Sequence, residues 1–174
     1  MPAYQGRLDG LCGQYAITNA LELCGLGRHR DTLFRTACAS APVERWPVLL
    51  WKGTEFSDLR RMVGSCLKSP ANRLGVKARY PLSRGTPATN SDYWDRFDDA
   101  FADDNAVCGI VGLVAPHSHW VVVVPEGGRV AFVDSTPEQP IYRKNRASLF
   151  AGYRRAKPTQ WLLDRRELVV FSRP

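Results

Sequence analysis

Residues 119–135 read HWVVVVPEGGRVAFVDS, two apolar runs separated by a short polar segment. Valine-rich runs favour β-strands, and a Gly-Gly pair between two such runs is typical of a tight hairpin turn. We therefore predict strands over 119–124 and 129–135, with the turn centred on Gly127 and Gly128. Neighbouring antiparallel strands in the second half of the chain define its fold class.

The register of this hairpin brings two ionisable side chains together. A turn centred on the Gly-Gly pair sets Val121 opposite Asp134 and His119 opposite Thr136. Because side chains alternate along a strand, all four share one face, and His119 and Asp134 become diagonal neighbours about 7–8 Å apart at the backbone. A carboxylate within reach holds an imidazole in one tautomer and stabilises its charged form. His117, beside Pro116, is a rival base that we expect to line a loop.

A candidate nucleophile lies far upstream, in residues 9–21, which read DGLCGQYAITNAL. Apolar residues follow the cysteine at helical spacing, at Ala16, Ile17, Ala20, Leu21 and Cys24. We predict a helix that Asp9 caps and that ends at Gly25 or Gly27. Cys12 would then lie in the first turn, where unpaired backbone N–H groups favour a thiolate and can hold an oxyanion.

The remaining segments predict helices first and strands afterwards. Further helices are expected over 31–39, capped by Asp31, over 54–66, capped by Thr54, and over 91–104; further strands are expected within 74–82, 106–114 and 159–172, and an irregular connection within 41–53. This order indicates an α+β fold, and the length suits one domain over residues 1–174.

Composition excludes several classes of protein. The formal net charge is +7, but the 24 basic residues are spread along the chain, which favours a solvated basic face over a nucleic-acid arm. The chain contains no run of about 18 apolar residues, so we expect no membrane span. The start of the chain lacks a secretory leader pattern, so we expect a cytoplasmic protein or export by a leaderless route.

The number and spacing of the five cysteines bear on whether the chain forms disulfides or binds a metal. They are odd in number and show no Cys-x-x-Cys spacing, and the chain has three histidines. This predicts neither a disulfide framework nor a metal site, and no cofactor motif is present. Apart from Cys12, the cysteines are expected to serve as packing residues.

The order Gln5, Cys12, His119 and Asp134 resembles that of papain-like cysteine peptidases. The nucleophile segment is most similar to Josephin-type deubiquitinases, through Leu11, Cys12, Gly13, Gln14, Asn19 and Leu21, and the SHWVVV segment resembles the one carrying their histidine. Bacteriocin-processing peptidases and bacterial effector proteases share this skeleton. The resemblance implies a papain-like fold, a Cys12–His119–Asp134 triad and a Gln5 side chain in the oxyanion hole. Residues 28–105 resemble no family.

The expected function is therefore hydrolysis of peptide or isopeptide bonds in a protein or peptide substrate, which the resemblance suggests could be ubiquitin-like. The same site could instead deamidate or transglutaminate a protein glutamine, because both reactions share the acyl-enzyme step. A third reading is a non-enzymatic basic binding module of papain-like fold, whose binding to nucleic acid would depend steeply on salt.

Overall fold

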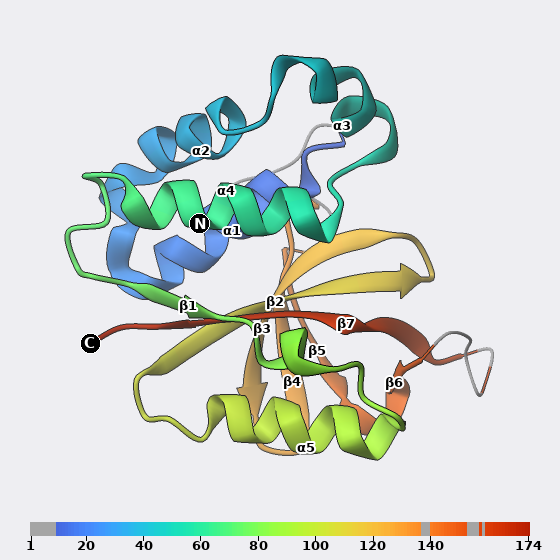
Figure 1. Ribbon diagram of the computed structural model, residues 1–174. Helices are drawn as coiled ribbons and strands as arrows, with labels where there is room; N and C mark the ends of the chain where they lie inside the picture. The colour runs from blue at the N-terminus through green and yellow to red at the C-terminus, as the bar shows by residue number, and fades with distance from the viewer. Residues whose placement is uncertain (1–9, 137–139, 153–156, 158) are drawn as a thin grey trace.

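The computed structural model describes residues 10–136, 140–152, 157 and 159–174. The helices and strands follow one another as α1 (Cys12–Leu21), α2 (Arg30–Ala39), α3 (Trp46–Lys52), α4 (Phe56–Lys68), β1 (Lys77–Arg79), α5 (Asn90–Phe101), β2 (Ala106–Ala115), β3 (His119–Glu126), β4 (Arg129–Val133), β5 (Ile141–Asn145), β6 (Leu149–Ala151) and β7 (Trp161–Ser172). The chain is therefore a mixed α+β protein, with helices in its N-terminal part and a largely antiparallel sheet in its C-terminal part (Figure 1).

The sheet has the strand order β1-β7-β2-β3-β4-β5, and every pair along this path is antiparallel. Strand β6 is the exception to the expected antiparallel sheet, because it pairs with β7 in parallel. Strands β5 and β6 were not predicted. Strand β5 is a sheet edge among the described residues, and its polar, half-exposed residues lack the apolar signal of the central strands.

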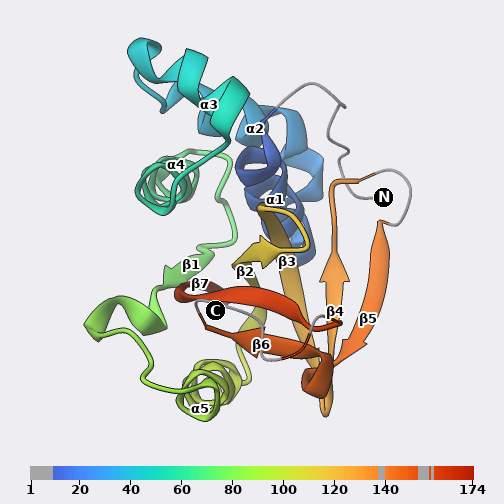
Figure 2. The ribbon, with the colours of Figure 1, turned by 90° about the vertical axis from the view of Figure 1, so that its right-hand side faces the viewer.

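Helices cover both faces of the sheet. Helices α1, α2 and α4 lie over one face and α5 lies against the other (Figures 1 and 2). Ile110 packs in the core beneath α1, and the next residue, Val111, packs in the core beneath α5. Val122 and Val123 of β3 divide in the same way. Burial on both faces explains why these strands read as continuous apolar runs rather than alternating ones.

The hairpin register is confirmed. Glu126 pairs with Arg129 and Val122 with Val133, as a turn centred on Gly127 and Gly128 requires. Gly127 has a φ of +63°, a conformation that glycine adopts without strain. Strand β4 ends at Val133, two residues earlier than predicted, so the residues after it belong to the loop that follows.

Three predicted helix caps need correction, and α5 ends at Phe101, three residues before the predicted end at 104. The cap of α1 is Leu11, which offers no side-chain hydrogen bond, and Asp9 lies outside the described residues. Asp31 lies within the first turn of α2, because that helix already begins at Arg30. Thr54 does not cap α4, whose cap position is Glu55; the Thr54 hydroxyl instead bonds to another helix. Helix α1 itself ends at Leu21, and Gly25, one of the two predicted ends, breaks the π-helical segment Glu22–Leu26 that follows with a φ of +92°.

Two predicted segments differ in type or length. The connection 41–53, expected to be irregular, contains α3, in which Pro47 occupies the first turn, where proline is tolerated. The strand expected within 74–82 is reduced to three residues in β1. Within the described part of the chain, none of the helices has the length and apolar character needed to cross a membrane.

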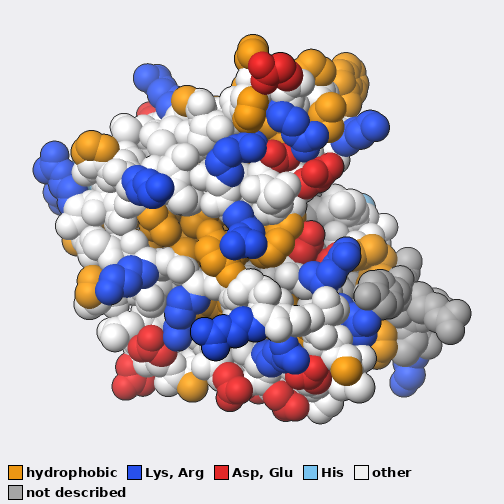
Figure 3. All heavy atoms as spheres, viewed as in Figure 1, with side chains coloured by type: hydrophobic (Ala, Val, Ile, Leu, Met, Phe, Trp, Pro, Cys, Tyr) orange, Lys and Arg blue, Asp and Glu red, His pale blue; other side chains and the backbone are white. Residues whose placement is uncertain are grey.

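The basic residues are dispersed over the face of the molecule that Figure 3 shows. Figure 3 shows lysine and arginine side chains scattered over one whole face, with aspartate and glutamate among them. Several form local ion pairs, including Arg96 with Asp92 at 2.8 Å and Arg143 with Glu126 at 2.8 Å. On this face the excess positive charge is not concentrated in a single stripe.

Candidate active site

Cys12 is the first residue of α1 and is buried, with 8% of its surface exposed. The backbone N–H groups of a first helical turn have no acceptor within the helix, so they are available to a ligand. The chain enters α1 under tight constraint. The Gly10 N–H donates to the Leu50 carbonyl at 3.1 Å, and a Cβ on Gly13 would lie 2.7 Å from the Thr54 hydroxyl oxygen.

His119 and Asp134 form the pair that the hairpin register predicts. His119 opens β3, and Asp134 follows the last residue of β4. The His119 Nε2 lies 2.7 Å from the Asp134 Oδ1, and both side chains are buried. Because Asp134 engages Nε2, the Nδ1 atom is the ring nitrogen left for another partner. Cys12 lines the same cavity as His119 and lies close enough to the imidazole to affect its pKa, so the three side chains form one group.

His119 and Asp134 each stabilise the charged form of the other. Burial opposes the charged form of His119, but the hydrogen bonds to Asp134 and Cys12 and the negative charges of both raise its pKa to about 9. Burial likewise opposes the charged form of Asp134, yet the hydrogen bond and charge of His119, with two further donors, hold the pKa of Asp134 below its usual value. The geometry therefore favours an imidazolium–carboxylate pair at neutral pH.

Two further groups orient the Asp134 carboxylate. The Thr136 N–H donates to Oδ1 at 3.0 Å, and the Tyr142 hydroxyl donates to Oδ2 at 3.1 Å. Burial, followed by the negative charge of Asp134, raises the pKa of Tyr142, so this hydroxyl keeps its proton and stays a donor. Sequence reasoning missed Tyr142 because it lies on β5, which the residue pattern does not reveal.

Trp120 connects the histidine strand to the segment that precedes α4. Its indole N–H donates to the Thr54 carbonyl at 2.6 Å, and its ring stacks on Phe56 with centroids 5.9 Å apart. The Thr54 hydroxyl in turn donates to the Gln14 Oε1 at 3.1 Å, within α1. Residues 53–55 therefore tie the helix that carries Cys12 to the strand that carries His119.

A cavity of about 310 Å³ opens beside this group. Cys12 and His119 both line it, so a ligand in the cavity can reach the thiol and the imidazole. The remaining lining comes from the segment before α4, from β2 and the loop after it, and from β7: Lys52, Gly53, Thr54, Glu55, Gly112, Leu113, Val114, Ser118, Trp120, Asp164 and Glu167. Sequence reasoning did not select Asp164 or Glu167, although a charged DRRE segment inside an otherwise apolar strand is an available signal.

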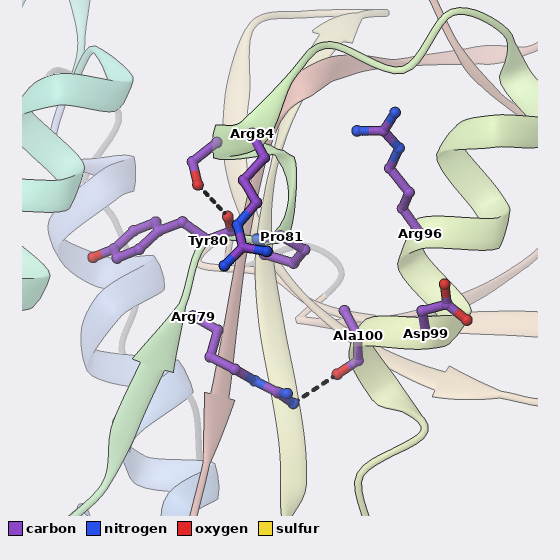
Figure 4. Close-up of a pocket in the computed structure, with 8 residues that line it drawn as sticks. Arg79, Tyr80, Pro81, Arg84, Arg96, Asp99 and Ala100 are labelled. Atoms are coloured by element: carbon purple, nitrogen blue, oxygen red, sulfur yellow. Dashed lines mark hydrogen bonds between the residues drawn. The ribbon is translucent and has the colours of Figure 1, made fainter.

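A larger cavity, of about 510 Å³, lies elsewhere, between α5 and the segment around β1 (Figure 4). Three arginines line it, but two are engaged within the protein: the Arg79 guanidinium donates to the Ala100 carbonyl at 3.0 Å, and Arg96 bonds to Asp92 and to the Gly85 carbonyl. Neither a cysteine nor a histidine lines this cavity. The smaller cavity is therefore the candidate active site, because it alone of the two contains a nucleophile beside a base.

The remaining candidate residues are His117 and Gln5, together with the other cysteines. His117 is exposed in the loop between β2 and β3, as expected, with its ring centroid 5.7 Å from that of His119. Gln5, the predicted oxyanion donor, lies outside the described residues. All five cysteines have free thiols. No group of three histidine, cysteine, aspartate or glutamate side chains suited to a metal ion occurs in the described ranges.

Comparisons with protein-family models, with curated proteins and with solved structures find no match to this chain.

Proposed function

We propose that this protein is a cysteine hydrolase of papain-like fold that cleaves peptide or isopeptide bonds. The observation that carries the proposal is the connected group of Cys12, His119 and Asp134 at the wall of a cavity. A thiol at a helix N-terminus, an imidazole in contact with it and a carboxylate behind the imidazole are the three parts of nucleophilic cysteine catalysis.

Each group has a role in the proposed reaction. His119 accepts the thiol proton, and the Cys12 thiolate attacks the carbonyl carbon of the substrate amide. The oxyanion that forms accepts a hydrogen bond from the Cys12 N–H, and we assign the second donor to the Gln5 side chain. His119 then donates its proton to the leaving amine, which leaves a thioester on Cys12.

Water completes the cycle. His119 removes a proton from a water molecule, the hydroxide attacks the thioester, and the thiol is regenerated as the acid product leaves. Throughout, Asp134 accepts a hydrogen bond from Nε2, which leaves Nδ1 as the ring nitrogen that exchanges a proton with Cys12, and the carboxylate stabilises the charged imidazole. Thr136 and Tyr142 hold the carboxylate in place through their hydrogen bonds.

Burial of the ionic pair supports this proposal over a binding module. Burying a carboxylate and an imidazolium removes both from water, which costs several kcal/mol per ion before their attraction is counted. Hydrogen bonds at 2.7, 3.0 and 3.1 Å offset that loss for Asp134. A module that binds through surface charge has no use for such an arrangement next to a thiol.

The deciding experiment measures how fast iodoacetamide alkylates Cys12 between pH 4 and pH 9, with the labelled residue located by mass spectrometry. We expect selective labelling of Cys12 well below pH 8, because a neighbouring imidazolium favours the thiolate. The His119→Ala variant should label at least about tenfold more slowly at pH 6 to 7. The matched variant His117→Ala, which removes an exposed histidine nearby, should keep the wild-type rate.

An opposite result is equally clear. If labelling of Cys12 rises only near pH 8.5, as for an ordinary thiol, and is unchanged in His119→Ala, the proposal is wrong. If selective labelling is found, a screen of peptide and ubiquitin-type substrates follows, in which Cys12→Ala should abolish turnover while its unfolding temperature stays close to that of the wild type.

A further inference from the structure

The pairing of β7 with β2 is interrupted where β7 passes the candidate active site. Leu163 pairs with Leu113 of β2, and Leu168 pairs with Val111. Residues 164–167 therefore stand opposite Gly112 alone, which makes a β-bulge. Bulges redirect side chains out of the regular alternation and are frequent beside active sites. This bulge contributes Asp164 and Glu167 to the wall of the cavity that holds Cys12 and His119.

Gly112 leaves room for one of these carboxylates. A Cβ built on Gly112 would lie 2.0 Å from the Glu167 Oε2, far inside van der Waals contact. The Glu167 carboxylate therefore occupies the space that a side chain at position 112 would fill. Only a residue without a side chain allows Glu167 this position in the cavity wall.

The two carboxylates differ in how they are satisfied. Asp164 forms an ion pair with Arg166 at 3.3 Å. Glu167 is half-buried and has no hydrogen bond or ion pair with any residue that the structure describes. A half-buried carboxylate without a partner loses hydration and gains nothing in exchange, so a cation in the cavity would stabilise it.

The electrostatic surroundings of Glu167 agree with this reading. Burial raises its pKa most, the negative charge of Asp164 adds to this effect, and Arg166 opposes it, which leaves a pKa of about 7. The other ionisable groups around the cavity are Lys52 and Glu55 before α4, His119 on β3 and Cys12 on α1. A bound cation would favour the ionised form of Glu167 and lower this pKa.

We propose that Glu167 determines specificity by binding a positively charged substrate side chain, lysine or arginine, close to the bond that is cleaved. The inference rests on the proposed function, because the cavity is a substrate site only if Cys12 is a nucleophile. The presence of Cys12 and His119 in the same cavity is the independent reason to expect a ligand there. Glu167 contacts the substrate in this proposal, and Asp164, already paired, adds negative potential.

The test compares irreversible peptide chloromethyl ketones that alkylate the active-site thiol. In each pair of probes, arginine or its uncharged isostere citrulline occupies one of the three positions before the ketone. The second-order rate of Cys12 labelling is measured by mass spectrometry at pH 6 and pH 8. We expect arginine at one position to be favoured about tenfold over citrulline at pH 8. The preference should shrink at pH 6, where Glu167 is mostly protonated.

Two variants assign the preference to its residue. In Glu167→Gln the ratio of arginine to citrulline rates should fall close to one at both pH values. Glu126→Gln removes the same charge from an exposed pair at the other end of β3 and should leave the ratio unchanged. Because each result is a ratio for one protein at one pH, the titration of Cys12 and His119 cancels.

The outcomes separate the two proposals. If arginine and citrulline probes label Cys12 equally, and labelling still depends on His119, the hydrolase stands and the role of Glu167 is wrong. The role of Glu167 is also wrong if the arginine preference survives in Glu167→Gln. If no probe labels Cys12 at either pH and iodoacetamide shows an ordinary thiol, both proposals fail.

Discussion

His119 and Asp134 are each less than a tenth exposed, and they lie fifteen residues apart in the sequence. Their pairing makes a contribution to the free energy of unfolding that depends on pH. The folded state raises the pKa of His119 from its usual 6.5 to about 9. A group whose pKa is raised on folding stabilises the protein fully below its unfolded pKa, and this contribution is lost as the pH rises through the folded pKa.

The variant Asp134→Asn tests this at the level of one residue. Without the carboxylate, burial has the larger effect on the pKa of His119, and the imidazole is neutral. The variant should therefore lack the stabilisation that the wild type shows below about pH 6.5. We expect a difference in the free energy of unfolding of about 2–3 kcal/mol at pH 6.5 that shrinks as the pH rises and is largely lost once the pH reaches about 9. Urea unfolding of both proteins from pH 6 to pH 10 measures it.

The control is Asp98→Asn, which removes an aspartate from an exposed pair with Arg146. Its difference from the wild type should be small and should not vary over this pH range. A difference for Asp134→Asn that is equally constant would show that His119 does not carry the raised pKa.

At the scale of the secondary-structure elements, the contact between α1 and residues 53–55 aligns the nucleophile with the base. This contact depends on Gly13, because a Cβ at this position would lie 2.7 Å from the Thr54 hydroxyl oxygen, which leaves no space for a methyl group. The Thr54 carbonyl and hydroxyl bond to Trp120 and Gln14, so any shift of Thr54 is transmitted to both elements.

Replacing Gly13 with alanine should therefore destabilise the protein, although alanine is the better helix former. We expect a loss of about 1–3 kcal/mol from overpacking, measured by urea unfolding, with slower alkylation of Cys12. Gly64→Ala is the matched control, because Gly64 lies inside α4 and a Cβ there meets nothing within 4 Å. That variant should gain about 0.5–1 kcal/mol. Equal effects in the two variants would contradict the tight contact.

Element types were predictable where the signal is local. The β3–β4 register follows from the Gly-Gly turn and two apolar runs, and the structure agrees. Helix α3 and strand β5 escaped prediction for different reasons. Helix α3 includes a proline in its first turn, which reads as a break, and β5 carries polar residues that become a strand only because β4 offers its free edge.

Across the whole molecule, the core on the α1 side of the sheet buries most of the thiols. Cys24, Cys66 and Cys108 have no exposed surface, Cys12 is 8% exposed beside its cavity, and Cys38 is half-buried. Burial, followed by the charge of Cys38, raises the pKa of the Cys66 thiol to about 12. Cys24, Cys66 and Cys108 are therefore packing groups, and their reactivity reports on whether the folded state opens.

Ellman's reagent makes this measurable. In the folded protein we expect two thiols, Cys12 and Cys38, to react rapidly, and in Cys12→Ala only Cys38. Unfolding in urea should expose all five in the wild type. A third thiol that reacts as quickly in the native protein would mean that one of the cores opens readily.

The sequence by itself determined the α+β class, the hairpin and its register, and the His119–Asp134 pairing that the register implies, because each depends on residues near one another in the chain. Only the tertiary structure decided that Cys12 and His119 line one cavity, that Tyr142 holds Asp134, and that Glu167 enters the same cavity. Such contacts leave no local pattern, since they depend on how distant elements pack and on where β7 is interrupted opposite Gly112.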